Sequence, residues 1–286
     1  MGRDWGTMQR PKMRIVGAVL DSADPLGLAQ FYERLIGWSI VERGGPRPGY
    51  PSGDAWAALR SRSGDFWVEC QLEQHFTPPV WPGVEGKQLM MVHLDIAVSD
   101  MDAGLEWAAE GGGRLAEYQP RPEAHRVLLD PAGHPFCLFP NPELKGTARR
   151  PGMRVAGPVL DSGDPLGLAE FYERLLGRPI VERGGPRPGF PPEDGWALIR
   201  VSPPGDFNKI EFQFERYYAP PVWPAVEGKQ QAMMRLDVEV DDLNAGVAWA
   251  LEAGATAAEW QSPQHIRVLL DPAGHPFHLT TAGKSE

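Results

Sequence analysis

The chain has 286 residues, of which 42% are hydrophobic and 23% are charged, a composition typical of a globular protein with about two domains. A formal net charge of −10 argues against a nucleic-acid-binding surface, because affinity for phosphate requires a basic patch. With 33 glycines and 30 prolines, the sequence favours many short turns over long helical bundles.

The chain has only two cysteines, Cys70 and Cys137, which are too few for a disulfide framework. This scarcity predicts a cytoplasmic protein. The first residues contain no apolar signal core, and no run approaches the roughly 18 apolar residues that a membrane span needs. We therefore expect neither a membrane nor a nucleic acid as a partner.

Two copies of one sequence make up most of the chain. MRIVGAVLDSADPLGLAQFYERLIG (13–37) returns as MRVAGPVLDSGDPLGLAEFYERLLG (153–177), and RVLLDPAGHPF (126–136) returns at 267–277. The copies share a proline-tryptophan loop, PPVWP, but differ beside it, where His93 aligns with Arg235. Such long units indicate a duplicated domain rather than a solenoid of short repeats.

The first half of copy one predicts a strand followed by a helix. The β-branched, apolar run at 14–21 is typical of a buried strand. Asp24 and Pro25 suit the N-cap and N1 positions of a helix, and Gly37 suits its end. Between them, apolar residues recur at helical spacing.

The rest of the copy predicts further strands and a second helix. Segments 56–59, 66–72 and 90–98 have strand composition, and Asp100 favours the start of a helix. Residues 126–140 predict a hairpin around an Asp-Pro-Ala-Gly turn. Each copy is therefore a βαβββ half followed by a second such half, which together would form a curved sheet with a cupped face.

These motifs resemble the vicinal oxygen chelate superfamily, which includes glyoxalase I, bleomycin-resistance proteins and extradiol dioxygenases. The resemblance rests on DPLGLAQFYERLIG, HLDIAV and LLDPAGHPF and their second copies, and it is closest to tandem glyoxalase-like domains of actinobacterial type. It implies an α+β fold of two tandem domains, each of paired βαβββ modules that form a cupped mixed β-sheet with flanking helices. The expected domains are 13–141 and 152–282, joined by a linker at 142–151.

The resemblance also implies four side-chain positions in each cup that hold a metal in metal-using members. Carried over copy by copy, these positions are Gly17, Glu69, His93 and Cys137, then Gly157, Glu211, Arg235 and His278. Because glycine has no ligand atom, the first position is empty in both copies. Arginine has no lone pair to offer a cation, so copy two is expected to have lost its site.

In copy one, the implied metal ligands are Glu69, His93 and Cys137, which would hold one divalent ion of zinc, iron, manganese or nickel. A cup without any metal is the equal alternative. Glu69, His93 and Asp95 are the expected catalytic residues, with a carboxylate moving a proton. The structural alternatives are a hydrogen-bonded buried histidine and a small buried cysteine.

A second group of side chains is expected to bind the substrate. The tryptophans would form aromatic walls, Glu211 would pair with Arg235, and Arg235 would contact an anionic or carbonyl-bearing ligand. These residues are Trp56, Trp81, Trp196, Glu211, Trp223, Arg235 and His278.

Two functions follow from the resemblance. The first is a small-molecule enzyme with isomerase, lyase or ring-opening chemistry on a carbonyl- or oxygen-bearing metabolite, with at most one metal site. The alternative is a protein that sequesters a flat hydrophobic drug or metabolite without catalysis, as bleomycin-resistance proteins do. The expected partner is a small molecule, and pairing of the domains within one chain or in a homodimer stays open.

Overall fold

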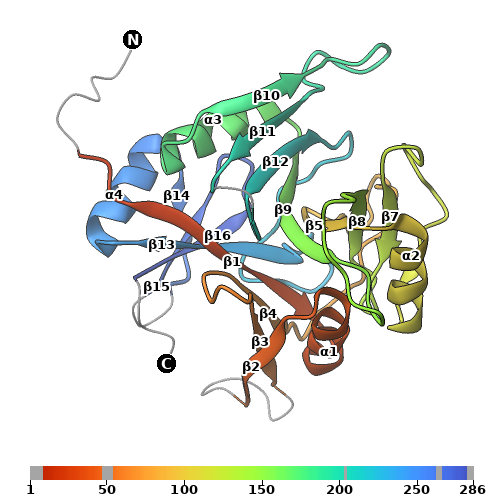
Figure 1. Ribbon diagram of the computed structural model, residues 1–286. Coiled ribbons are helices and arrows are strands. Elements are labelled where there is room, and N and C mark those ends of the chain that lie inside the picture. Colours follow the sequence, from red (N-terminus) through yellow and green to blue (C-terminus); the bar gives the residue numbers. More distant parts are fainter. Residues whose placement is uncertain (1–8, 47–53, 203–204, 262–265, 282–286) are drawn as a thin grey trace.

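The computed structural model describes residues 9–46, 54–202, 205–261 and 266–281. The last residue of the second expected domain, at position 282, lies outside these ranges, as do residues 1–8 of the segment examined for a signal core. Over the described residues the chain forms two eight-stranded mixed sheets and four helices, the α+β architecture expected of two tandem glyoxalase-like domains (Figure 1).

Four modules of similar structure follow one another along the chain. The first contains β1 (Met13–Ser22), α1 (Pro25–Ile36), β2 (Ser39–Gly44), β3 (Trp56–Arg60) and β4 (Trp67–Leu72). The second contains β5 (Val92–Val98), α2 (Met101–Glu110), β6 (Arg114–Leu115), β7 (Arg126–Leu129) and β8 (Pro135–Pro140). The third contains β9 (Met153–Ser162), α3 (Pro165–Leu176), β10 (Ile180–Gly184), β11 (Trp196–Arg200) and β12 (Lys209–Phe214). The fourth contains β13 (Met234–Val240), α4 (Leu243–Ala253), β14 (Thr256–Ala257), β15 (Ile266–Leu270) and β16 (Pro276–Thr281).

Local sequence accounts for the ends of the helices. The Asp24 carboxylate accepts a hydrogen bond from the backbone N–H of Gly27 at 3.0 Å, and Pro25 occupies the first turn of α1. The helix ends at Gly37, whose φ of 69° lies in the left-handed region that glycine adopts without strain. These features confirm the predicted helix start and stop.

The strands pair across the two copies. Sheet A has the order β14-β15-β16-β13-β1-β4-β3-β2, and sheet B has the order β10-β11-β12-β9-β5-β8-β7-β6. Each sheet therefore joins the first half of one copy to the second half of the other. The antiparallel pairs β1–β13 and β5–β9 form the two junctions, as the crossing segments in Figure 1 show.

The helices cover one face of each sheet. Helices α1 and α3 pack on their own sheets and also contact β9 and β1 of the other sheet, so the core lies between the two sheets. Aromatic rings pack against each other in this core. The ring centres of Phe31 and Phe136 lie 5.9 Å apart, and those of Phe171 and Phe277 lie 6.2 Å apart. The opposite face of each sheet, here called the cup face, is left for other side chains.

Two hydrogen-bonded clusters fix the turn of each DPAGHP motif. The Asp130 carboxylate contacts His134 Nδ1 at 2.9 Å and accepts a hydrogen bond from the Tyr32 hydroxyl at 3.1 Å. Asp271 contacts His275 in the same way at 2.8 Å. Because both histidines are buried and each Nδ1 is paired with an aspartate, they have a structural role in the core, although His134 Nε2 has no hydrogen-bond partner among the described residues.

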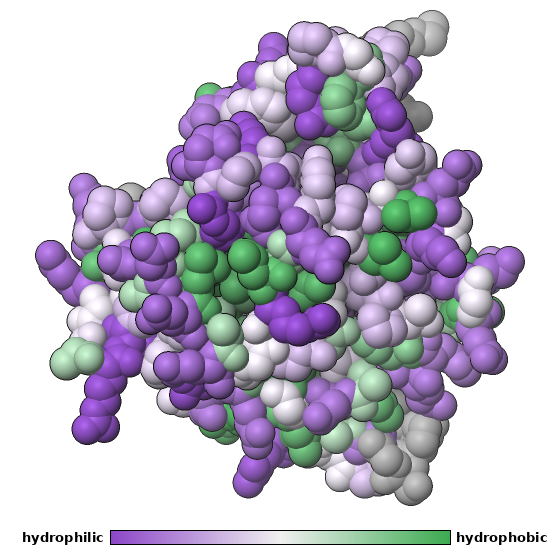
Figure 2. Space-filling model, turned by 90° about the vertical axis from the view of Figure 1, so that its right-hand side faces the viewer, coloured by the Kyte–Doolittle hydropathy of each residue, from purple (hydrophilic) through white to green (hydrophobic). Residues whose placement is uncertain are grey.

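No helix of the described residues is long and apolar enough to cross a membrane. The face in Figure 2 carries mostly hydrophilic side chains, with a small group of apolar ones near its centre.

Candidate functional site

The strand order places the predicted metal ligands on two different sheets. Glu69 lies on β4 in sheet A, whereas His93 on β5 and Cys137 on β8 lie in sheet B. The prediction that Glu69, His93 and Cys137 together bind one metal ion is therefore wrong, because their strands belong to different sheets. The position equivalent to Glu69 on the His93 sheet is Glu211, on β12 of copy two.

The cup face of sheet B gathers four ionisable side chains around His93. Asp95 follows two residues later on the same strand, and Cys137 is its register partner on β8. Lys209 and Glu211 come from β12. One ligand atom each from His93, Asp95 and Cys137 lies within 4.8 Å of the other two.

Lys209 is the cation of this cluster. Its Nζ donates to Glu211 Oε2 at 2.7 Å and, in a shorter contact, to Asp95 Oδ2. These two carboxylates raise the pKa of Lys209 against the opposing effect of burial. Lys209 is not among the predicted site residues, although the copies differ there: WVECQL in copy one aligns with KIEFQF in copy two.

Burial sets the direction of the pKa shifts of His93, Asp95 and Cys137. It lowers the pKa of His93 to about 4, so the imidazole is neutral near pH 7 and keeps a lone pair. Burial also raises the pKa of the Cys137 thiol well above its usual value. It raises the pKa of Asp95, although Lys209 opposes the shift.

Two buried polar atoms in this cluster have no hydrogen-bond partner among the described residues, His93 Nδ1 and Asp95 Oδ1. A buried polar atom without a partner is costly and calls for an explanation, such as an ion or a ligand group. His93 Nε2 lies 3.9 Å from Asp95 Oδ1, too far for a hydrogen bond. The donor set is mixed, with one nitrogen, one oxygen and one sulfur.

An apolar wall adjoins the cluster. Trp81, Leu129 and Phe139 pack against Cys137 and its apolar neighbours. Trp81 is anchored by a hydrogen bond from its Nε1 to the Tyr118 carbonyl oxygen at 3.1 Å. The loop that carries this tryptophan is held by contacts between the copies, because the Gln88 amide pairs with the backbone of Gln231.

The cup face of sheet A has different chemistry at equivalent positions. Arg235, where sheet B has His93, donates to Gln71 Oε1 at 2.9 Å and lies 3.4 Å from Asp21 Oδ1. The expected pairing of Arg235 with Glu211 is therefore wrong, because Glu211 lies in sheet B, where it accepts from Lys209.

Trp67 replaces Lys209 in sheet A. Its indole crosses Gly17, where a Cβ would lie 2.5 Å from the ring, and its Nε1 donates to Asp237 Oδ2 at 2.8 Å. The glycine at the first family position thus makes room for the tryptophan. Asp237 Oδ1 in turn faces His278 Nδ1 at 3.4 Å.

The other predicted tryptophans separate between the sheets. Trp223, on the loop before β13, lies against side chains of sheet A, with its ring centre 6.4 Å from that of His278 and 5.6 Å from the guanidinium carbon of Arg235. Trp56 pairs with Gln71 in sheet A, and Trp196 pairs with Gln213 in sheet B. These last two therefore do not line one cup, since they occupy the same position on different sheets.

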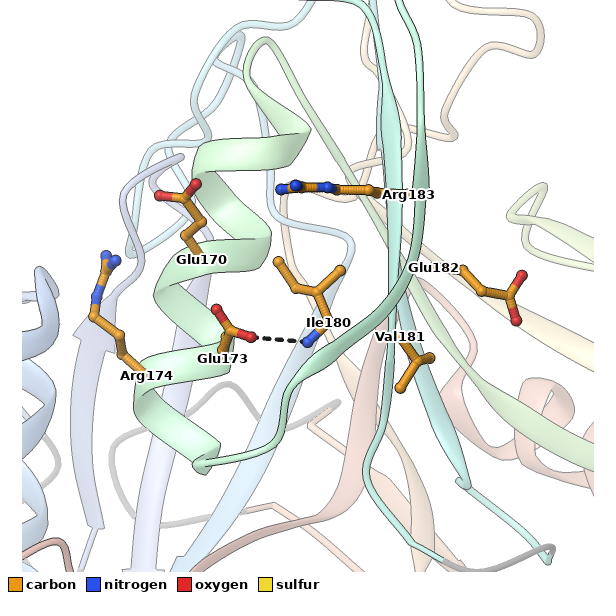
Figure 3. A pocket seen from close by; sticks show the side chains of 7 residues that line it. All are labelled: Glu170, Glu173, Arg174, Ile180, Val181, Glu182 and Arg183. Atoms are coloured by element: carbon orange, nitrogen blue, oxygen red, sulfur yellow. Dashed lines mark hydrogen bonds between the residues drawn. The ribbon is translucent and has the colours of Figure 1, made fainter.

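A cavity of about 440 Å³ lies elsewhere, between α3 and β10 (Figure 3). Charged side chains line most of it, including Glu170, Arg174 and Arg183, and the Glu173 carboxylate accepts a hydrogen bond from Ile180 N at 2.9 Å. It contains none of the predicted site residues.

Comparisons with known proteins agree with this architecture. The sequence profile of the glyoxalase-like domain matches residues 17–139 and again 158–280. No curated protein matches the chain. Among solved structures, glyoxalase I from Zea mays superposes with a TM-score of 0.67 at 16% identity, covering 94% of this chain and 92% of the maize chain. A putative dioxygenase from Bacillus subtilis superposes with a TM-score of 0.63 at 12% identity, covering 96% and 87%.

Proposed function

The chain belongs to the glyoxalase-like domain family, and from that premise we propose that it is a small-molecule enzyme whose reaction site is the His93 cluster of sheet B. Its substrate would carry a carbonyl group or neighbouring oxygens. The observation that carries the proposal is the neutral, buried His93, whose Nε2 lies 3.9 Å from Asp95 Oδ1, an oxygen without a hydrogen-bond partner among the described residues.

The residues of the cluster fit one divalent metal ion. His93, Asp95 and Cys137 would hold it, because nitrogen, oxygen and sulfur donors together suit zinc and related metals. Lys209 engages Asp95 through Oδ2 and leaves Oδ1 available. Cys137 would have to release its proton on binding, so metal uptake should liberate acid. When bound, such an ion polarises a carbonyl oxygen.

The remaining residues would position the substrate and move a proton. The Glu211 side chain is 24% exposed, against 2% for Asp95, so Glu211 is the carboxylate that a bound molecule can reach. Lys209 holds the Glu211 oxygen at 2.7 Å and fixes its direction. Trp81 and Phe139 would shield the reacting atoms from water.

The experiment that tests this proposal is a measurement of bound transition metal per chain, after purification without a metal-affinity step and after incubation with excess zinc. We expect about one equivalent in the wild-type protein and a large loss in His93→Ala, since one of three ligands is removed. His75→Ala, which changes an exposed histidine, is the matched control and should retain the metal.

Absence of metal uptake under these conditions would contradict the proposal of a metalloenzyme. The alternative of sequestration would then gain support from the anchored Trp81. In that case Trp81→Ala should weaken the binding of a flat aromatic probe, anilinonaphthalene sulfonate, more than His93→Ala does.

A further inference from the structure

A buried aspartate and a glutamine lie side by side at the same place in each sheet. In sheet A, Gln71 Nε2 donates to Asp21 Oδ1 at 2.7 Å, and the two residues are register partners on β4 and β1. In sheet B, Gln213 Nε2 donates to Asp161 Oδ1 at 2.6 Å, and these two are register partners on β12 and β9. Both sheets therefore contain the same hydrogen-bonded aspartate–glutamine pair.

Arg235 binds to this pair in sheet A. Its Nη2 donates to Gln71 Oε1 at 2.9 Å, and its Nη1 lies 3.4 Å from Asp21 Oδ1. The Trp223 ring lies over the guanidinium, with its centre 5.6 Å from the guanidinium carbon. One planar cation thus neutralises the aspartate and satisfies the amide oxygen through two separate nitrogens, a geometry that suits a guanidinium.

His93 occupies the place of Arg235 in sheet B. Val159 pairs with His93 across the junction of β9 with β5, as Val19 pairs with Arg235 across the junction of β1 with β13. The imidazole is shorter than an arginine side chain, and burial keeps it neutral. It therefore supplies no cation to the aspartate–glutamine pair beside it.

Asp161 consequently lacks a counter-charge. Within the described ranges it forms no ion pair with a lysine, arginine or histidine, and Lys209 is held by Asp95 and Glu211 instead. Burial and the neighbouring acids Glu215 and Asp95 raise the pKa of Asp161 well above its usual value. A buried carboxyl group in this state gains from the arrival of a cation.

The glutamine of sheet B is also the more accessible of the two. Gln71, which binds Arg235, is 9% exposed, whereas Gln213 is half-buried. Over the part of the chain that the structure describes, the Gln213 side chain makes one hydrogen bond, to Asp161. Because both amides donate to their aspartate through Nε2, Gln213 Oε1 takes the place that Gln71 Oε1 has in sheet A, without the arginine.

We propose that Asp161 and Gln213 bind a guanidinium or amidinium group of the substrate, which takes in sheet B the place that the Arg235 guanidinium has in sheet A. One N–H of the ligand donates to the Asp161 carboxylate and another donates to Gln213 Oε1. Trp81, which aligns with Trp223, packs against side chains of sheet B and offers its ring to the planar cation.

This inference rests on the proposed function, because it assigns a substrate class to the same face of sheet B. Asp161 lies two residues along β9 from Val159, the register partner of His93. Two residues of a strand span about 7 Å. A substrate whose carbonyl group lies at the His93 cluster would therefore carry its cationic group about 7 Å away, at the end of a short linker.

The test measures the binding of benzamidine, an aromatic amidinium, by calorimetry on metal-free protein in the presence of EDTA. Benzamide, a neutral molecule of the same shape, is the comparison ligand. We expect benzamidine to bind at least tenfold more tightly than benzamide, because only the amidinium neutralises Asp161. The absence of metal separates this result from metal uptake at His93.

Two substitutions test the pair itself. Asp161→Asn removes the charge and keeps the shape, so it should weaken benzamidine binding at least tenfold and leave benzamide binding unchanged. His93→Arg would supply from the chain the cation that Arg235 supplies in sheet A, and it should weaken benzamidine binding to a similar degree. His93→Ala is the matched control, since it removes the imidazole without adding a cation and should keep the affinity for benzamidine.

The stability of the variants should also differ between the sheets. Asp161→Asn should melt at or above the temperature of the wild type, because the carboxyl group has no counter-charge to lose. Asp21→Asn, which breaks the contact with Arg235, should melt at a lower temperature.

The proposal is overturned if benzamidine binds no more tightly than benzamide, or if its affinity survives either Asp161→Asn or His93→Arg. Should these variants fail to fold, the ¹³C chemical shift of the wild-type Asp161 carboxyl group decides, and a shift that benzamidine leaves unmoved would also overturn it. Because His93→Ala is expected to lose the metal yet keep benzamidine, each of the two proposals can fail alone.

Discussion

At the scale of single residues, one difference separates the two cup faces. Lys209 and Trp67 occupy equivalent positions, and each donates to an aspartate of the neighbouring half, Asp95 or Asp237. The lysine brings a charge that two carboxylates neutralise, whereas the indole brings a donor without charge. In each sheet, the donor that sets the net charge of the site and the aspartate that accepts its hydrogen bond therefore come from different copies.

Lys209→Met is predicted to destabilise the fold by roughly 3 kcal/mol, because breaking a buried ion pair leaves a carboxylate without its partner. The loss should grow as the pH rises, since the unpaired Asp95 would have to remain protonated. Urea denaturation at several pH values measures both effects. Lys229→Met, at an exposed position, is the control, and equal stability of the two variants would contradict the prediction.

At the scale of elements, local sequence patterns predicted most of the helices and strands. The helix after Asp24, the strand around His93 and the hairpin at 126–140 form as the sequence predicts. Strand β2 was not predicted, because its side chains are mostly exposed and lack an alternating apolar pattern.

The pairing of the halves could not be predicted. Copies that are so alike offer every strand two nearly identical partners, so composition cannot tell pairing within a copy from pairing between copies. The grouping of Glu69 with His93 failed for this reason. Comparing the copies residue by residue would have identified Lys209 as well as Arg235.

The turn before β12 carries a pH-dependent group. Burial raises the pKa of Asp206 from 3.8 to about 6, although Arg154 opposes the shift. Between these two values the unfolded chain loses its proton while the folded chain keeps it, so the contribution of Asp206 to stability falls as the pH rises through this window.

Asp206→Asn should therefore flatten the pH profile and stabilise the protein near pH 7 by about 1 kcal/mol, a figure reduced for partial exposure. The free energy of unfolding measured from pH 4 to pH 7 checks this. Asp65→Asn, at the equivalent and exposed turn before β4, is the matched control. A wild-type profile in the Asp206 variant would refute the assignment.

At the scale of the whole molecule, the two copies interlock. Each sheet depends on an antiparallel junction between halves of different copies, β1 with β13 and β5 with β9. The connection at 142–151 is mostly exposed, with an isolated bridge between Thr147 and Arg150. The covalent link is therefore a small part of what holds the copies together.

A protease site inserted after Arg149 should let the chain be cut without separating the fragments. Both junctions and the core remain intact after the cut, and a longer loop adds little closure entropy. Native mass spectrometry should find one complex with the mass of the whole chain, and denaturing electrophoresis should find two fragments. Fragments that separate under native conditions would contradict this prediction.

The pairing of strands between copies has a consequence for the evolution of the sequence. A substitution in the first half of copy two alters the face that holds His93. Lys209, for example, is separated from its partner Asp95 by 114 residues of chain. Because each sheet takes strands from both copies, the loss of either copy would remove part of both faces. Specialisation can still proceed, because matched changes in distant halves give each face its own chemistry.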